Sequence, residues 1–172
     1  MPDPDPGRAI TPRFPTDSKT ANTDLLHAFF QWESGQGANP QEAGLRCSRL
    51  AYFSELFLAS FLQRLDGPSH TLDRLTAGIL DAYLGVWYPA ESGLATASDL
   101  DLQLDAFRRF IAFLGATGRF RGSATEWAGV EHHLDGGERF HRRLREWEEL
   151  HRQAADDPDW WIRRERWMTA AW

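Results

Sequence analysis

The apolar positions of residues 98–114 repeat at helical spacing on two faces. At about 100° per residue, one stripe holds Leu100, Leu104, Phe107, Ile111 and Leu114. A second arc on the far side holds Leu102, Ala106, Phe110 and Phe113, and a narrow polar wedge holds Asp101, Asp105, Arg108 and Arg109. A helix that is apolar on two sides requires neighbours on both. Residues 98–114 are therefore predicted to form the central helix of an all-α domain.

Local signals predict both ends of this helix. Ser98 is followed three residues later by Asp101, which is the spacing of a capping box. Gly115 suits the left-handed conformation that often ends a helix. The predicted helix therefore begins at Ser98 and ends at Leu114.

Similar apolar spacing predicts helices on either side. The expected segments are 23–33, 40–66, 69–88, 123–134, 138–155 and a last one that begins with Asp157 as its cap and Pro158 at its first helical position. Pro40 occupies the favoured first helical position of the second segment, and Pro89 is expected to end the third segment. Ser123 and Glu126 form a second capping-box spacing. The fold predicted is a single compact bundle of six or seven helices around residues 98–114.

The first nineteen residues differ from the rest of the chain. They hold five of the nine prolines and show almost no apolar periodicity. This composition is typical of a disordered arm. The predicted organisation is a flexible arm over residues 1–19 and one all-α domain over residues 20–172.

Charge and cysteine content narrow the classes of function. A net charge of −6 provides no global attraction for nucleic acid or an anionic membrane. Cys47 is the only cysteine, which excludes an intrachain disulfide. Arg46 and Arg49 would lower the pKa of its thiol if it were exposed, but a small buried residue is the favoured interpretation. Without an apolar run of signal-peptide or membrane-span length, we expect a cytoplasmic protein that does not enter a membrane.

Histidines and carboxylates offer one candidate for chemistry. The residues in question are Glu131, His132, Glu138 and His141. A Glu-x-x-His pair places both side chains on one helix face, as di-iron bundles require. Those bundles take their pairs from different helices, however. Here the two Glu-x-x-His pairs, Glu138/His141 and Glu148/His151, lie on the same predicted helix. A metal-binding or enzymatic bundle is therefore the alternative hypothesis, and the leading one expects no cofactor and no catalytic residue.

Paired arginines suggest nucleic-acid binding as a further alternative. They occur at Arg108-Arg109, Arg119/Arg121, Arg142-Arg143 and Arg163-Arg164. Residues 138–166 contain eight arginines and eight acidic residues, so the charges cancel in that region. Asp105 stands four residues before Arg109, the spacing of a local ion pair. These features disfavour a nucleic-acid partner.

The end of the chain is rich in tryptophan. Its large apolar residues are Trp160, Trp161, Trp167, Met168 and Trp172. They could close the core, because large aromatics dominate cores. They could also anchor a protein interface, where tryptophan is enriched. These residues cover more than half of a helix, more than one packed side can bury. We therefore predict a protein interface here, with a second copy of the chain as the first candidate partner.

Three segments of the second half occur in a recognisable order: LDAYLGVWYP (80–89), AFRRFIAFLGATGRF (106–120) and ADDPDWWIRRERW (155–167). In this order they resemble a helical region, covering here residues 72–172, in uncharacterised proteins of high-GC bacteria. The resemblance implies a helical fold and no particular chemistry. Together these observations favour a non-catalytic cytoplasmic interaction or accessory protein.

Overall fold

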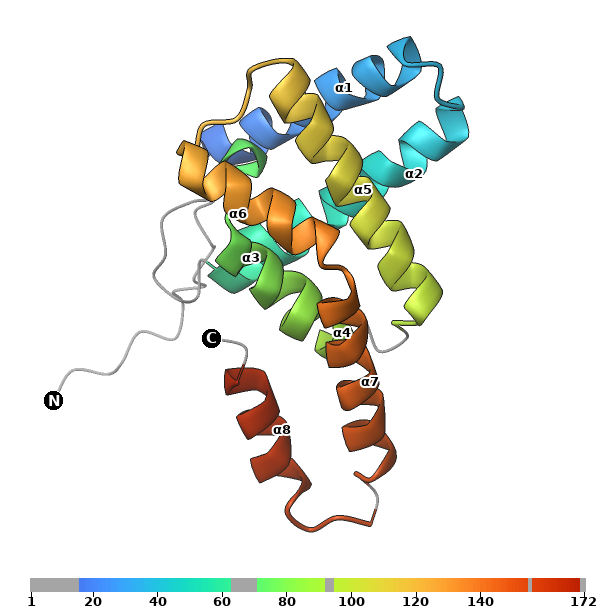
Figure 1. Ribbon diagram of the computed structural model, residues 1–172, viewed down its shortest axis with the longest axis vertical. Coiled ribbons are helices and arrows are strands. Elements are labelled where there is room, and N and C mark those ends of the chain that lie inside the picture. The colour runs from blue at the N-terminus through green and yellow to red at the C-terminus, as the bar shows by residue number, and fades with distance from the viewer. Residues whose placement is uncertain (1–15, 63–70, 92–94, 155, 171–172) are drawn as a thin grey trace, which may run out of the picture.

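The computed structural model describes residues 16–62, 71–91, 95–154 and 156–170, and this part of the chain is helical without a strand (Figure 1). The helices are α1 (Thr16–Gly35), α2 (Pro40–Tyr52), the π-helix η1 (Phe53–Leu62), the 3₁₀-helix η3 (Leu72–Arg74), α3 (Ala77–Ala82), the π-helix η4 (Tyr83–Trp87), α4 (Tyr88–Glu91), α5 (Ala97–Ala116), α6 (Ala124–Asp135), α7 (Glu138–Arg152) and α8 (Trp160–Thr169). The prediction of an all-α bundle is confirmed. Residues 1–15 of the predicted arm lie outside the described residues, and residues 16–19 belong to α1.

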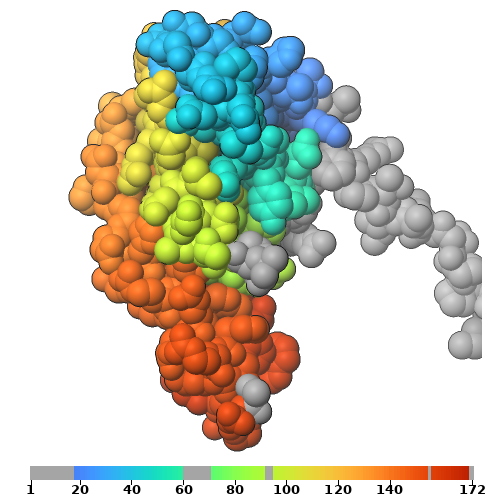
Figure 2. Space-filling view, turned by 90° about the vertical axis from the view of Figure 1, so that its right-hand side faces the viewer, coloured from blue at the N-terminus to red at the C-terminus, as the bar shows by residue number. Residues whose placement is uncertain are grey.

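The helices form a body and a projecting hairpin. In the body, α2 packs against α1 and α5, and α6 packs against α3 and α5 (Figure 1). From the end of α6 the chain continues into α7, and α8 folds back along α7. Figure 2 shows these last two helices as a narrower lobe at one end of the molecule.

Helix α5 occupies the central position that its two apolar faces predict. The five residues of the predicted stripe are buried, as are Ala106, Phe110 and Phe113 of the second arc. Leu102 was expected in that arc but is 47% exposed. The reason is that α1 reaches only the C-terminal half of α5, where Phe29 packs against Phe110 and Phe113 at ring distances of 5.3 and 5.6 Å.

Both ends of α5 differ from the prediction. Thr96, not Ser98, caps the helix: its hydroxyl accepts the Asp99 N–H at 3.1 Å and donates to the Asp99 carboxylate at 2.7 Å. At the other end Gly118, with φ of 62°, adopts the left-handed conformation. The Arg119 N–H reaches back to the Leu114 carbonyl at 2.9 Å. Gly115 has another role, because a Cβ there would lie 2.9 Å from the Trp127 ring of α6.

The third predicted helix is interrupted, and residues 69 and 70 lie outside the described residues. The Thr76 side chain caps a new start at Ala77. The helix then widens into η4, where the Tyr88 N–H bonds to the Tyr83 carbonyl, and continues through Pro89 instead of ending there. The second predicted helix also changes from an α-helix to a π-helix, because α2 passes into η1 at Phe53.

A buried carboxylate joins three helices of the body. Glu33 of α1 is 0% exposed and contacts Arg46 of α2 at 2.7 Å and Arg109 of α5 at 2.6 Å. Arg46 also binds Asp105 of α5 at 2.7 Å, and that hydrogen bond is the main factor that raises the pKa of Arg46. The local Asp105–Arg109 pair predicted from spacing is thus replaced by pairs to other helices.

Replacing Glu33 with glutamine should destabilise the fold by about 3 kcal/mol. This is the lower end for a buried pair, because Arg46 and Arg109 keep access to water. Glu149→Gln, which affects an exposed pair with Arg152, should cost less than about 1 kcal/mol. Urea denaturation of both variants measures the difference, and equal costs would contradict the assigned role of Glu33.

Two apolar positions on α5 should respond differently to truncation. Phe107→Ala removes a fully buried ring that packs edge-on against Phe53 and should cost about 3–5 kcal/mol. Leu102→Ala should cost less than about 1 kcal/mol because the side chain is half exposed. Thermal and urea denaturation compare the two, and a large loss at Leu102 would show that something covers it.

Candidate functional site

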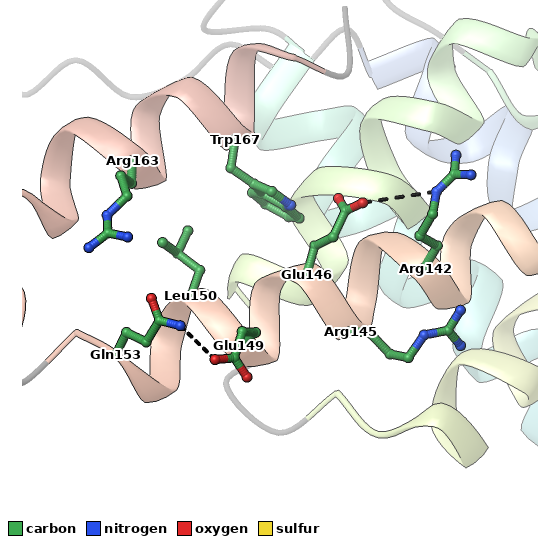
Figure 3. A pocket seen from close by; sticks show the side chains of 8 residues that line it. All are labelled: Arg142, Arg145, Glu146, Glu149, Leu150, Gln153, Arg163 and Trp167. Atoms are coloured by element: carbon green, nitrogen blue, oxygen red, sulfur yellow. Dashed lines mark hydrogen bonds and ion pairs between the residues drawn. The ribbon is translucent and has the colours of Figure 1, made fainter.

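The α7–α8 hairpin contains most residues of the predicted interface. Phe140 and Leu144 of α7 are buried, while Trp147 and Leu150 on the part farther from the body are half-buried. The Trp167 ring lies 5.0 Å from the Trp147 ring. In Figure 3 Trp167 points from α8 down to α7. A small apolar contact therefore joins the two helices.

The turn between the helices differs in detail from the prediction. Asp157 was expected to cap the last helix with Pro158 in its first turn, but α8 begins at Trp160. Asp157 instead accepts the Asp159 N–H at 3.0 Å and forms an ion pair with Arg163. This geometry is an Asx turn, in which an aspartate stabilises the chain before a helix.

Arg143 connects the hairpin to the body. Its guanidinium donates to the Trp167 carbonyl at 2.7 Å, to the Gly85 carbonyl at 3.2 Å and to Glu146 at 3.1 Å. It also lies 3.9 Å from the centre of the Trp167 ring. Burial lowers the pKa of Arg143. Pro89, four residues after Gly85, has no N–H to donate to this carbonyl.

The outer side of α8 exposes adjacent apolar side chains. Trp161 is 68% exposed and Ile162 is 60% exposed. The half-buried Trp160 ring meets the Trp161 ring edge-on at 4.4 Å. The indole N–H of Trp160 is buried and has no hydrogen-bond partner among the described residues. The start of α8 thus presents an exposed apolar surface.

The five predicted interface residues occupy different environments. Trp161 is exposed, Trp160 and Met168 are half-buried, and Trp167 is buried against α7. Trp172 lies outside the described residues. The apolar surface available to a partner is therefore centred on Trp161 and extends to Ile162, which the sequence pattern did not single out.

A groove of about 540 Å³ runs between α7 and α8. Its charged lining alternates in sign, with Arg142 and Arg145 beside Glu146 and Glu149, and Arg163 across from them on α8 (Figure 3). The charges are partly paired, as between Arg142 and Glu146 at 3.9 Å. The groove provides a mixed-charge surface between the two helices.

The candidate metal ligands do not converge. Glu131 and His132 are exposed, whereas His141 contacts Asp101 at 2.8 Å and Glu138 contacts Arg145 at 2.5 Å. Hydrogen bonding and charge from Arg145 lower the pKa of Glu138. Over the described parts of the chain, no three His, Cys, Asp or Glu side chains are placed to hold a metal ion.

Several arginines of the predicted pairs contact acceptors within the chain. The Arg108 guanidinium donates to the Leu134 carbonyl at 2.7 Å, and Arg121 lies 2.9 Å from Asp73. Arg109 and Arg143 have the partners described above. These four arginines therefore contact separate acceptors.

The thiol of Cys47 is half-buried and lies 3.6 Å from the Leu26 carbonyl. Burial raises its pKa to about 11, and the nearby charge of Glu33 adds to the effect. Few thiolates exist at neutral pH under these conditions. The environment is that of a packing residue.

No protein-family model, curated protein or solved structure matches this chain. The resemblance of residues 72–172 to a helical region of high-GC bacteria therefore stays a prediction. Within the described residues, no helix combines the length and apolar character that crossing a membrane requires.

Arg143→Met should release α8 from the body without unfolding the body. Amide hydrogens of residues 160–169 should exchange at least roughly tenfold faster, because two hydrogen bonds from a charged donor are lost. Arg142→Met, at the exposed neighbouring position, is the matched control and should leave exchange in α8 unchanged. Hydrogen exchange measured by mass spectrometry tests this, and equal exchange in both variants would show that Arg143 does not hold α8.

Proposed function

We propose that this chain is a non-catalytic interaction protein that pairs with a second copy of itself through the α7–α8 hairpin. The observation that carries the proposal is the exposed Trp161–Ile162 pair at the start of α8. Large apolar side chains that stay exposed together are typical of protein interfaces, and tryptophan is the most frequent anchor in them.

The distribution of charge supports a second copy as the partner. The chain carries a net charge of −6, but residues 138–166 hold eight arginines and eight acidic residues. Two copies that meet through this neutral region keep their net negative parts away from the contact. A surface with both signs of charge also complements itself across a twofold axis, where each residue meets its counterpart's neighbours.

The shape of the molecule supports the same arrangement. The hairpin projects from one end of the body (Figure 2), so two hairpins can lie side by side without a collision between bodies. Two helical hairpins packed together make a four-helix bundle, a stable and frequent arrangement. Trp161 and Ile162 would then be covered by the helices of the other copy.

The experiment is a measurement of molar mass by light scattering over a range of protein concentrations. Wild-type protein should approach the mass of a dimer, and Trp161→Glu should shift the equilibrium to the monomer with its helical circular dichroism intact. Leu102→Glu is the matched control, because Leu102 is also an exposed large apolar residue on a helix but lies on α5. It should behave as the wild type.

Two outcomes would contradict the proposal. One is a wild-type protein that stays monomeric at the highest concentration reached. The other is a dimer that Trp161→Glu and Leu102→Glu weaken equally, which would place the interface elsewhere.

A further inference from the structure

A second feature of interest lies in the body, away from the hairpin. A pocket of about 400 Å³ opens between α2 and the N-terminal half of α5, with Tyr88 of α4 on its wall. The residues that line it are Leu45, Ser48, Arg49, Tyr52, Tyr88, Ala95, Asp99 and Gln103. Its volume falls within the range of small-molecule sites, and its lining combines aromatic rings with a few polar groups, as such sites do.

Arg49 brings to this pocket a positive charge that no carboxylate of the described residues neutralises, and it lies beside the Tyr88 hydroxyl. Arg46, one turn earlier on α2, is held by Glu33 and Asp105, whereas Arg49 has no carboxylate within ion-pair distance among the described residues. Its side chain is half-buried. A half-buried guanidinium without a carboxylate is suited to binding one from a ligand, because its planar donors match the two oxygens.

Asp99 brings the opposite charge. Its carboxylate accepts a hydrogen bond from the Thr96 hydroxyl at 2.7 Å, and within the described part of the chain it has no cationic partner. Arg49 and Asp99 line one pocket but form no ion pair with each other. The pocket thus holds separate positive and negative groups, each able to bind a charge of the opposite sign.

Gln103 is a polar residue buried between the helices, and its burial costs free energy. Gln103 is 3% exposed, and its Oε1 atom has no hydrogen-bond partner in the described structure. Unpaired buried polar atoms are rare in cores, where an apolar side chain would be more stable. Burial raises the pKa of the adjacent Tyr88, and Gln103 and Arg49 oppose that effect.

We propose that this pocket binds a small zwitterion of the α-amino acid class. Arg49 binds the ligand carboxylate, Asp99 binds the ammonium group, and the rings of Tyr52 and Tyr88 pack against the ligand side chain. Gln103 is a polar part of the pocket wall and contacts the charged end of the ligand. The site shares no residue with the hairpin and does not depend on dimer formation.

The first experiment uses isothermal titration calorimetry with four compounds. L-phenylalanine and L-leucine are the probes, and L-phenylalaninamide and N-acetyl-L-phenylalanine lack the carboxylate and the ammonium charge respectively. At least one free amino acid should bind with a dissociation constant below about 1 mM. For that side chain, the amide and the N-acetyl derivative should each bind at least roughly tenfold more weakly, since each loses one charged contact. If leucine is the better ligand, leucinamide and N-acetyl-L-leucine replace the phenylalanine derivatives.

The second experiment assigns each charge to its residue. Arg49→Gln should weaken the binding of the free amino acid by at least roughly tenfold. It should also abolish the difference in affinity between the amino acid and its amide. Asp99→Asn should abolish the difference between the amino acid and its N-acetyl derivative. Arg142→Gln, on the hairpin, is the control and should bind as the wild type. Circular dichroism melting confirms that each variant is folded.

Several results would overturn the proposal. They are the absence of binding by both free amino acids at about 10 mM, equal binding of the free and blocked compounds, or unchanged affinity in folded Arg49→Gln. If Arg49→Gln fails to fold, the comparison of free and blocked compounds with the wild type still decides the outcome. The dimer variant Trp161→Glu should bind the amino acid normally, which separates this site from the hairpin.

Discussion

The buried carboxylate of Glu33 is the constraint on which the arrangement of the body depends. A charge that is fully removed from water must be paired, and here the two partners come from different helices, Arg46 on α2 and Arg109 on α5. This requirement fixes where α1 lies relative to both. On the same helix Phe29 then meets Phe110 and Phe113 of α5. The ionic and aromatic contacts thus specify one arrangement of three helices.

The hairpin is joined to that body in a different way. Among the described residues, α8 is attached by ring contacts of Trp167 with Trp147 and of Trp160 with His151, and Arg143 contacts both the carbonyl and the ring of Trp167. Pro89 lacks the N–H that an α-helix would direct at the Gly85 carbonyl, and this carbonyl accepts from Arg143. A firmly specified body and a lightly attached final helix suit a protein in which the final helix takes part in association.

Sequence reasoning succeeded where the information was local. Helical periodicity identified the core stripe of α5, and the Ser123–Glu126 spacing identified a capping box that the structure contains. It failed where several residues could play one role, since both Ser98 and Thr96 can cap a helix and Gly115 and Gly118 can both end one.

Nothing in a periodic pattern predicts that Glu33 is buried, because charged residues are assigned to the surface until their partners are known. The pocket could not be predicted either, since Arg49, Tyr88 and Gln103 lie far apart in the sequence and meet only in the fold. The interface residues stay a prediction, and Trp161 is the most exposed of those that the structure describes.

The clustering of tryptophan in the hairpin has an optical consequence. Of the residues that the structure describes, Trp147, Trp160, Trp161 and Trp167 lie in the hairpin, and Trp32, Trp87 and Trp127 lie in the body. Fluorescence emission therefore reports largely on the environment of the hairpin, whereas far-ultraviolet circular dichroism reports mainly on the longer helices of the body. During denaturation, the two signals separate whenever α8 detaches first, and they coincide when the whole chain unfolds as one cooperative unit.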